Sequence, residues 1–384
     1  MKHITTAVAL LALSAGVSQA ADDSQQAFLG IFAETSVMKM VGMKKPDLPP
    51  GFKLPPGVKL PPEAAALLAG SAPQRKLSVR LWSPGIAPEG ATASLAVPEG
   101  LKQGPKLDLE LYRPKPEEGA DTGTDTPGKP GNIDMSMTIK QYWGSSATVR
   151  PGQPEVIEFK GLSKEQQGEM RRQSSRASQG NSYFYKPNWT TGYWPTGKQP
   201  GMIDPEAVLE GHYALTSSYT GNVAIDVPAK VTLMDPIEMT SPPLEQKIPL
   251  ENAIRFRWKA IPNALGYHAT IFGMIGTKTI IMWDSSEIKP RMGFMYDYLQ
   301  MSEVADFVKQ TMFMAGDTVE VTVPEAIFKD CDIVQMTMIG WGPGTALDKA
   351  QPLPRVQTKT TLSLMLGGKK MAGLGGRRGG GDDE

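Results

Sequence analysis

The chain has almost none of the residue that cross-links many exported proteins. Cys331 is the single cysteine among 384 residues, so no disulfide can form within the chain. Stability must come from buried apolar side chains, and a chain of this length has enough of them. Because Cys331 directly precedes an apolar segment, Asp332–Ile339, we expect a buried and unreactive thiol. An intermolecular disulfide is the alternative.

The chain also has no net charge and very little histidine. Lys and Arg together number 40, as do Asp and Glu, which argues against electrostatic attraction to nucleic acid. His212 and His268 are far apart, and no metal-ligand spacing, HExxH motif or GxSxG motif occurs. Gly192–Lys198 resembles a phosphate loop, but Gln199 stands where a magnesium-binding Ser or Thr is needed. These absences favour a protein without a cofactor and without catalytic activity.

No apolar run is long enough to span a bilayer, which needs about 20 residues. The first segment instead has the pattern of a secretory signal peptide over residues 1–20. Lys2 precedes an apolar stretch, Ile4–Leu13, and Ser18–Ala20 supplies small residues for cleavage after Ala20. We therefore expect a periplasmic or extracellular protein without a transmembrane segment.

Residues 21–75 are predicted to form a helical and proline-rich N-terminal segment. Apolar residues in Ala27–Met43 have a loose helical spacing. Three Leu-Pro-Pro units follow between residues 48 and 62, and they predict a stiff polyproline II spacer because proline fixes φ. Pro62–Gly70 is predicted to be a short helix that ends at its glycine.

Residues 76–235 are predicted to form a β-rich domain, because apolar residues occupy every second position. The expected strands are 77–82, 107–112, 135–139, 156–159, 213–216, 223–227 and 230–234. Two short helices are expected among them. Ser163–Gln166 has the residues of a capping box, and Asp204–Gly211 has an N-cap, a following proline and a final glycine.

Residues 236–366 are predicted to form a second β domain with one helix over residues 302–314. Its expected strands are 254–259, 267–272, 279–283, 318–323, 333–339 and 360–365. Residues 367–384 are rich in glycine and are predicted to be a disordered tail. The predicted fold class is mainly β, with two β-sandwich-like domains, a few short helices, a proline-rich spacer and this tail.

Residues 239–366 contain several features of one family of β-sandwiches. Phe256 and Trp258 alternate on one expected strand and Tyr267 opens the next, while Gly340–Gly344 follows an apolar strand. In these features the segment resembles a fibronectin type III or related immunoglobulin-like sandwich. It departs from that pattern at Cys331, near the place of an expected tyrosine, and in its central helix. The resemblance implies a role in contacts between molecules or in spacing domains.

Six aromatic residues gather between positions 183 and 194, in a segment rich in Gly, Pro, Asn and Thr. Exposed aromatic rings stack on sugars and anchor interfaces, so a ligand or partner surface is predicted here. The predicted surface residues are Tyr183, Tyr185, Trp189, Tyr193 and Trp194. The alternative is that the rings fold back into the protein core, which we expect for at least one of the two tryptophans.

Methionine is unusually frequent, with 21 residues. Most pairs, such as Met336 and Met338, are two positions apart, as expected for one buried face of a strand. Met38, Met40 and Met43 lie outside the expected strands and form a weak candidate site for Cu(I), which prefers thioether ligands.

The sequence as a whole favours an exported, non-catalytic protein of a bacterial-type cell envelope or of the medium, acting by binding or assembly. Its expected partner is an envelope or extracellular protein or a glycan, not nucleic acid. The first alternative is a polysaccharide-active hydrolase, although the spacing of the carboxylates does not single out a catalytic pair. The second alternative is a methionine-based copper-binding protein.

Overall fold

The computed structural model describes residues 27–42, 72–113, 137–159, 189–199, 201–290, 299–346 and 355–369. The protein is mainly β, as predicted, and its strands form one large mixed sheet and one small sheet. The expected helices at 62–70 and 163–166, the Leu-Pro-Pro units and the tail from residue 370 lie outside the described residues. Within the described ranges, no helix combines the length and the apolar character needed to cross a membrane.

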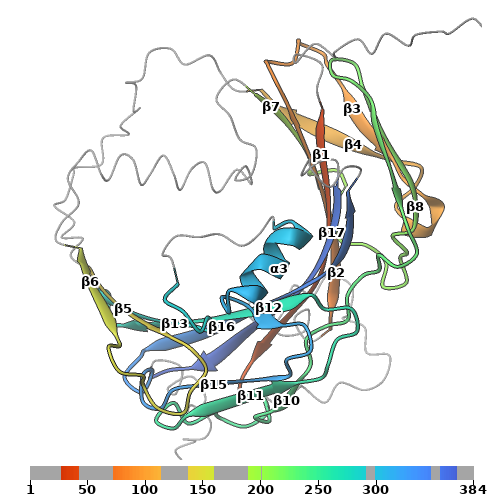
Figure 1. Ribbon diagram of the computed structural model, residues 1–384. Coiled ribbons are helices and arrows are strands. Elements are labelled where there is room, and N and C mark those ends of the chain that lie inside the picture. Colours follow the sequence, from red (N-terminus) through yellow and green to blue (C-terminus); the bar gives the residue numbers. More distant parts are fainter. Residues whose placement is uncertain are drawn as a thin grey trace, which may run out of the picture.

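The large sheet has 14 strands and curves so that one of its faces is concave (Figure 1). From edge to edge its strands are β6 (Glu155–Phe159), β5 (Met137–Trp143), β13 (Thr279–Asp284), β12 (Gly266–Ile275), β16 (Ile333–Ala346), β17 (Arg355–Gly367), β1 (Phe28–Met40), β2 (Gln74–Ser83), β7 (Thr190–Trp194), β4 (Lys106–Tyr112), β3 (Ala93–Ala96), β8 (Gly211–Ser217) and β9 (Val223–Val227). The two-residue strand β14 (Met314–Ala315) also pairs with β12, and a 3-10 turn, η2, covers Glu99–Leu101. Neighbouring strands are antiparallel except in the pairs β1–β17 and β13–β5.

A small sheet packs against the convex side of the large one (Figure 1). It consists of β10 (Met239–Ser241), β11 (Ile254–Trp258) and β15 (Glu320–Val323). Trp258 on β11 and Tyr267 on β12 meet between the two sheets with their ring centroids 5.5 Å apart in an edge-to-face arrangement. Both side chains are buried and belong to one hydrophobic core.

The buried apolar side chains form two large clusters along the sheet. The first lies between the small sheet and strands β12, β13, β16 and β17, and it includes Phe256, Trp258 and Tyr267. The second is enclosed by β1 to β4, β7, β8 and β9, and it includes Leu29 and Ile31. Strand β1 contributes to both clusters, because Val37 near its end belongs to the first. The long central strands therefore join the two clusters through one continuous sheet.

The helix predicted over Ala27–Met43 is wrong, since Phe28–Met40 form the strand β1. This strand lies between β17 and β2 and is apolar on both faces, with Leu29 and Ile31 in one cluster and Phe32 in another. A strand with both faces covered has no strict alternation of apolar and polar residues. Its run of apolar residues was therefore consistent with a helical spacing as well.

A second predicted helix, Asp204–Gly211, is also absent. Asp204 does act as a cap, because its Oδ1 accepts a hydrogen bond from the backbone of Glu206 at 2.7 Å. The backbone N–H of Ala207 donates to the carbonyl of Asp204, but that of Val208 donates to the carbonyl of Gly100. This tertiary contact keeps the chain from continuing beyond a single turn, so no helix forms.

The other expected elements form, with two differences. The predicted helix at 302–314 is present but shorter, as α3 (Met301–Lys309), because Met314 belongs to the strand β14. The helix α3 lies on the concave side of the sheet (Figure 1). Residues 230–234 do not form the predicted strand, although Val231 and Met234 are buried. The backbone N–H of Val231 closes a turn onto the carbonyl of Pro228, so these apolar residues fill the cores without strand pairing.

Candidate functional site

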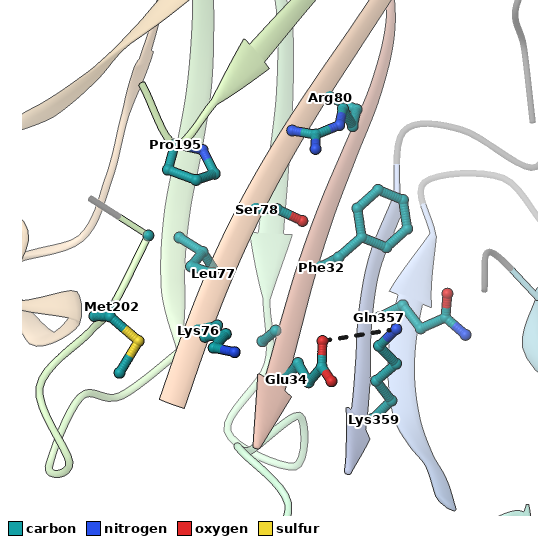
Figure 2. Close-up of a pocket in the computed structure, with 12 residues that line it drawn as sticks. Phe32, Glu34, Lys76, Leu77, Ser78, Arg80, Pro195, Met202, Gln357 and Lys359 are labelled. Carbon is teal, nitrogen blue, oxygen red and sulfur yellow. Dashed lines mark ion pairs between the residues drawn. The ribbon is translucent and has the colours of Figure 1, made fainter. Parts of the chain in front are cut away.

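A groove with a volume of about 390 Å³ lies on the concave face where β17, β1 and β2 run side by side (Figure 2). Its described lining residues are Phe32, Ala33, Glu34, Lys76, Leu77, Ser78, Arg80, Pro195, Gly201, Met202, Gln357 and Lys359. The three strands supply most of the floor, and the segment around Pro195 and Met202 forms the wall beyond β2. Volumes of this size are typical of small-ligand sites.

The strand register arranges the side chains of the floor as a grid. Each relevant residue of β1 has an in-register neighbour on β17 and on β2, and such neighbours point to the same face of a sheet. The rows of the grid are Arg355–Gly30–Arg80, Gln357–Phe32–Ser78 and Lys359–Glu34–Lys76. A cationic side chain therefore stands at every corner, around Phe32 at the centre.

Gly30 leaves room for the ring of Phe32 to lie across the sheet. A Cβ atom at position 30 would be 2.7 Å from two atoms of that ring, which is too close for any side chain. The guanidinium carbon of Arg355 lies 5.7 Å from the centroid of the same ring, in the range of a cation–π contact. The centre of the grid is thus apolar and closely packed.

The groove has an excess of positive charge. Among its described lining residues, Lys76, Arg80 and Lys359 are cations, and Glu34 is the carboxylate. Glu34 lies 3.7 Å from Lys359, at the long end of an ion pair. Arg80 is oriented by hydrogen bonds of 3.0 Å from its Nη1 to the carbonyls of Val79 and Trp194. Lys76 extends into solvent at the open side.

Gln357, like Arg80, lines the groove and has a buried polar atom without a hydrogen-bond partner in the described part of the chain. Its side chain is 6% exposed, yet its Oε1 atom accepts no hydrogen bond within the described part of the chain. A buried acceptor without a donor costs about 1–3 kcal/mol, so such groups are few in native proteins.

The predicted aromatic surface is divided between the core and the concave face. Trp194 is fully buried, and its Nε1 donates to Gln199 at 3.1 Å, so the core interpretation applies to this ring. Trp189 is half-buried and stacks on Phe28 with a centroid distance of 5.4 Å. Tyr193 is half-buried and lies in register with Arg80 of the grid. Tyr183 and Tyr185 lie outside the described residues.

Tyr193 borders the groove with a hydroxyl that stays protonated. Partial burial and a hydrogen bond with Glu110 raise the pKa of this hydroxyl above its usual value. Trp189, Phe28 and Trp82 extend the apolar floor from Phe32 along the sheet. Two of the predicted aromatic residues, Trp189 and Tyr193, therefore adjoin the groove, although neither lines it.

Two of the three methionines of the candidate copper site, Met38 and Met40, lie on the same concave face. Met38 and Met40 both belong to β1, and Met38 is 61% exposed, while Met43 lies outside the described residues. Met365 of β17 is the in-register neighbour of Met40. Among the described residues, no group of three or more His, Cys, Asp or Glu side chains could hold a metal ion.

A buried histidine–carboxylate pair lies elsewhere on the concave face, beneath the segment that includes α3. Nε2 of His268 is 2.9 and 3.0 Å from the two carboxylate oxygens of Asp284. The backbone N–H of Ser286 donates to the same carboxylate at 2.8 Å, and the ring of Phe313 lies 5.1 Å from the imidazole. The pair is enclosed by side chains, so we assign it the role of joining β12, β13 and the segment around Phe313.

Cys331 is buried, as expected, and lies in the core near Gly273 and Phe328. Burial, together with the charges of Asp330 and Asp332, raises the pKa of its thiol to about 11. Since the thiolate is the reactive form, we expect labelling by a disulfide reagent at pH 8 to be at least about 100-fold slower in the native protein than in denaturant. Native labelling should rise with pH towards 11. Rapid labelling of the native protein at pH 8 would contradict this assignment.

Comparisons of the chain with protein-family models, with curated proteins and with solved structures found no match.

Proposed function

We propose that the protein is an exported, non-catalytic binding or assembly protein of the cell envelope or the medium, and that the groove over β17, β1 and β2 is its ligand surface. The observation that carries the proposal is the excess of positive charge in the groove, where Lys76, Arg80 and Lys359 stand against Glu34 among the described lining residues. This excess makes the groove complementary to a ligand with negative charge. Such a surface needs no catalytic group.

The arrangement of the sheets supports the resemblance to a fibronectin type III or related sandwich and the role in molecular contacts that it implies. The small sheet of β10, β11 and β15 faces the part of the large sheet formed by β13, β12, β16 and β17. We propose that this part is one of two sandwich-like domains. The groove then lies where β1 extends the sheet of this domain beyond β17 towards the second hydrophobic cluster.

The hydrolase alternative has less support. Glycoside hydrolysis in most families uses two carboxylates about 5–10 Å apart. Glu34 is the single carboxylate among the described residues that line the groove, and Lys359 is its ion-pair partner. Copper binding by methionines remains a second alternative, because β1 and β17 bring Met365 beside Met40.

Charge reversal in the groove tests the proposal. Tagged mature protein is incubated with envelope fractions and with concentrated medium, and bound material is compared between the unmodified chain and two variants. Lys76→Glu is expected to lower retention at least about ten-fold, because like charges facing each other in an interface cost several kcal/mol. Lys259→Glu is the matched control, since Lys259 is exposed beside the small sheet and does not line the groove. No retention by the unmodified chain, or equal retention by Lys76→Glu, would overturn the proposal.

A further inference from the structure

We infer that the concave face of the large sheet carries a binding site for Cu(I), made of the thioether sulfurs of Met38, Met40 and Met365. The site lies outside the groove, whose described lining contains none of these residues. It goes beyond the proposed function and does not depend on it. Three features support it: the strand pairing, the exposure of the three side chains, and the chemistry of their neighbours.

Strand pairing brings the three methionines to neighbouring positions. Met40 of β1 and Met365 of β17 are partners in the parallel ladder, and Met38 stands on the same face two residues before Met40. Neighbouring strands lie about 4.8 Å apart, and residues two positions apart on a strand are separated by about 6.5–7 Å, so the three Cα atoms form a triangle whose longest side is about 8 Å. The midpoint of that side is about 4 Å from each Cα atom. Because a methionine side chain extends its sulfur well beyond Cβ, one ion above the triangle is within reach of all three.

These three side chains do not build a core. Met38 is 61% exposed, and Met40 and Met365 are half-buried. The hydrophobic clusters formed by the described residues contain none of them. Met336 and Met338, in contrast, are buried in the first cluster. The usual reason for two methionines two positions apart on a strand, a shared buried face, therefore applies to the second pair and not to the first.

The neighbours of these sulfurs select for a soft ion of low charge. In the two rows of the concave face that hold the methionines, the next residues across β17 and β16 are Ser363, Thr337 and Gln335, and none of them is charged. Ca²⁺ and Zn²⁺ sites are built mainly from carboxylates, imidazoles and thiolates, and these positions supply none of those groups. Thioether ligands without a charged neighbour suit Cu(I).

The sheet also supplies the third ligand that the sequence could not identify. The sequence grouped Met38 and Met40 with Met43, which lies outside the described residues and has no part in this site. Met365 takes the third position, and its backbone is tied to β1 because the N–H of Val41 donates to the carbonyl of Met365 at 2.9 Å. The backbone positions of the three ligands are therefore fixed before an ion binds.

Methyl NMR of the untagged, full mature chain tests which sulfurs bind. The methionine methyl groups are labelled with ¹³C, and Ag(I) serves as the probe because it is a soft ion that keeps its oxidation state. One equivalent of Ag(I) is expected to shift the methyl signals of Met38, Met40 and Met365 and to leave the other methionine signals in place. The variants Met38→Leu, Met40→Leu and Met365→Leu assign these signals, since each variant lacks one of them. No shift, or shifts at other methionines only, would overturn the site.

Competition with bicinchoninate for Cu(I), without oxygen, measures what each sulfur contributes. Each of the three variants is expected to weaken Cu(I) binding at least about ten-fold, since even residues that only orient metal ligands change metal affinity about 10- to 100-fold. Leucine conserves the volume of methionine, so circular dichroism should show an unchanged fold. Met282→Leu is the matched control and should bind Cu(I) as the unmodified chain does, because Met282 is half-buried on the same face and its register partners are Phe272 and Gln141. Unchanged affinity in Met40→Leu and Met365→Leu, or an equal loss in Met282→Leu, would overturn the assignment.

Discussion

The substitution His268→Ala is expected to lower the free energy of unfolding by about 3–5 kcal/mol. The imidazole is 3% exposed and is bonded to Asp284, which is itself 9% exposed. Without the histidine, the carboxylate stays buried with one hydrogen bond from Ser286. Removal of one member of a buried pair has this large effect because the other member is left without its partner in a medium of low dielectric constant.

The chain provides its own control in a second histidine–carboxylate pair. His212 and Asp226 are joined by a contact of 2.7 Å, but their side chains are 61% and 86% exposed. Exposed pairs contribute at most about 1 kcal/mol, so His212→Ala should have little effect. Urea denaturation of both variants, followed by circular dichroism, measures the difference. If the two variants lose similar amounts of unfolding free energy, burial of the His268–Asp284 pair is not the cause of the loss.

The local pattern of the sequence predicts most strands, and it fails where tertiary contacts decide the structure. Strands β2, β4, β8, β9 and β11 alternate clearly and were predicted near their observed positions, as were β12 and β13. Strand β1 was predicted as a helix, because apolar side chains lie on both of its faces and no strict alternation marks it as a strand. The single turn at Asp204 shows the same limit, since the carbonyl of Gly100 ends it from a distant part of the chain.

The groove could not be predicted from the sequence, because its grid depends on strand register. Its cations come from segments about 280 residues apart, and nothing near Lys76 or Lys359 marks them as neighbours. The parallel pairing of β1 with β17 brings them together on either side of Glu34. The aromatic cluster was a usable signal for the region, since Trp189 and Tyr193 adjoin the groove. The same signal could not show that Trp194 points into the core.

Trp258→Ala is expected to cost about 3–5 kcal/mol, the usual range for removal of a large buried aromatic side chain. Trp258 is 3% exposed and packs edge-to-face on Tyr267, so its removal leaves a cavity between the two sheets.

Two further substitutions show whether that loss comes from the sandwich core. Trp258→Phe keeps an aromatic ring and should cost clearly less than the alanine variant, because the cavity is smaller. Phe272→Ala removes a ring that is 37% exposed on the concave face of β12, and it should cost less than half as much as Trp258→Ala. Unfolding in denaturant gives all three values. A loss below about 1 kcal/mol for Trp258→Ala would place this residue outside the stabilising core, and the resemblance to a fibronectin type III sandwich would then lose the side chain on which it most depends.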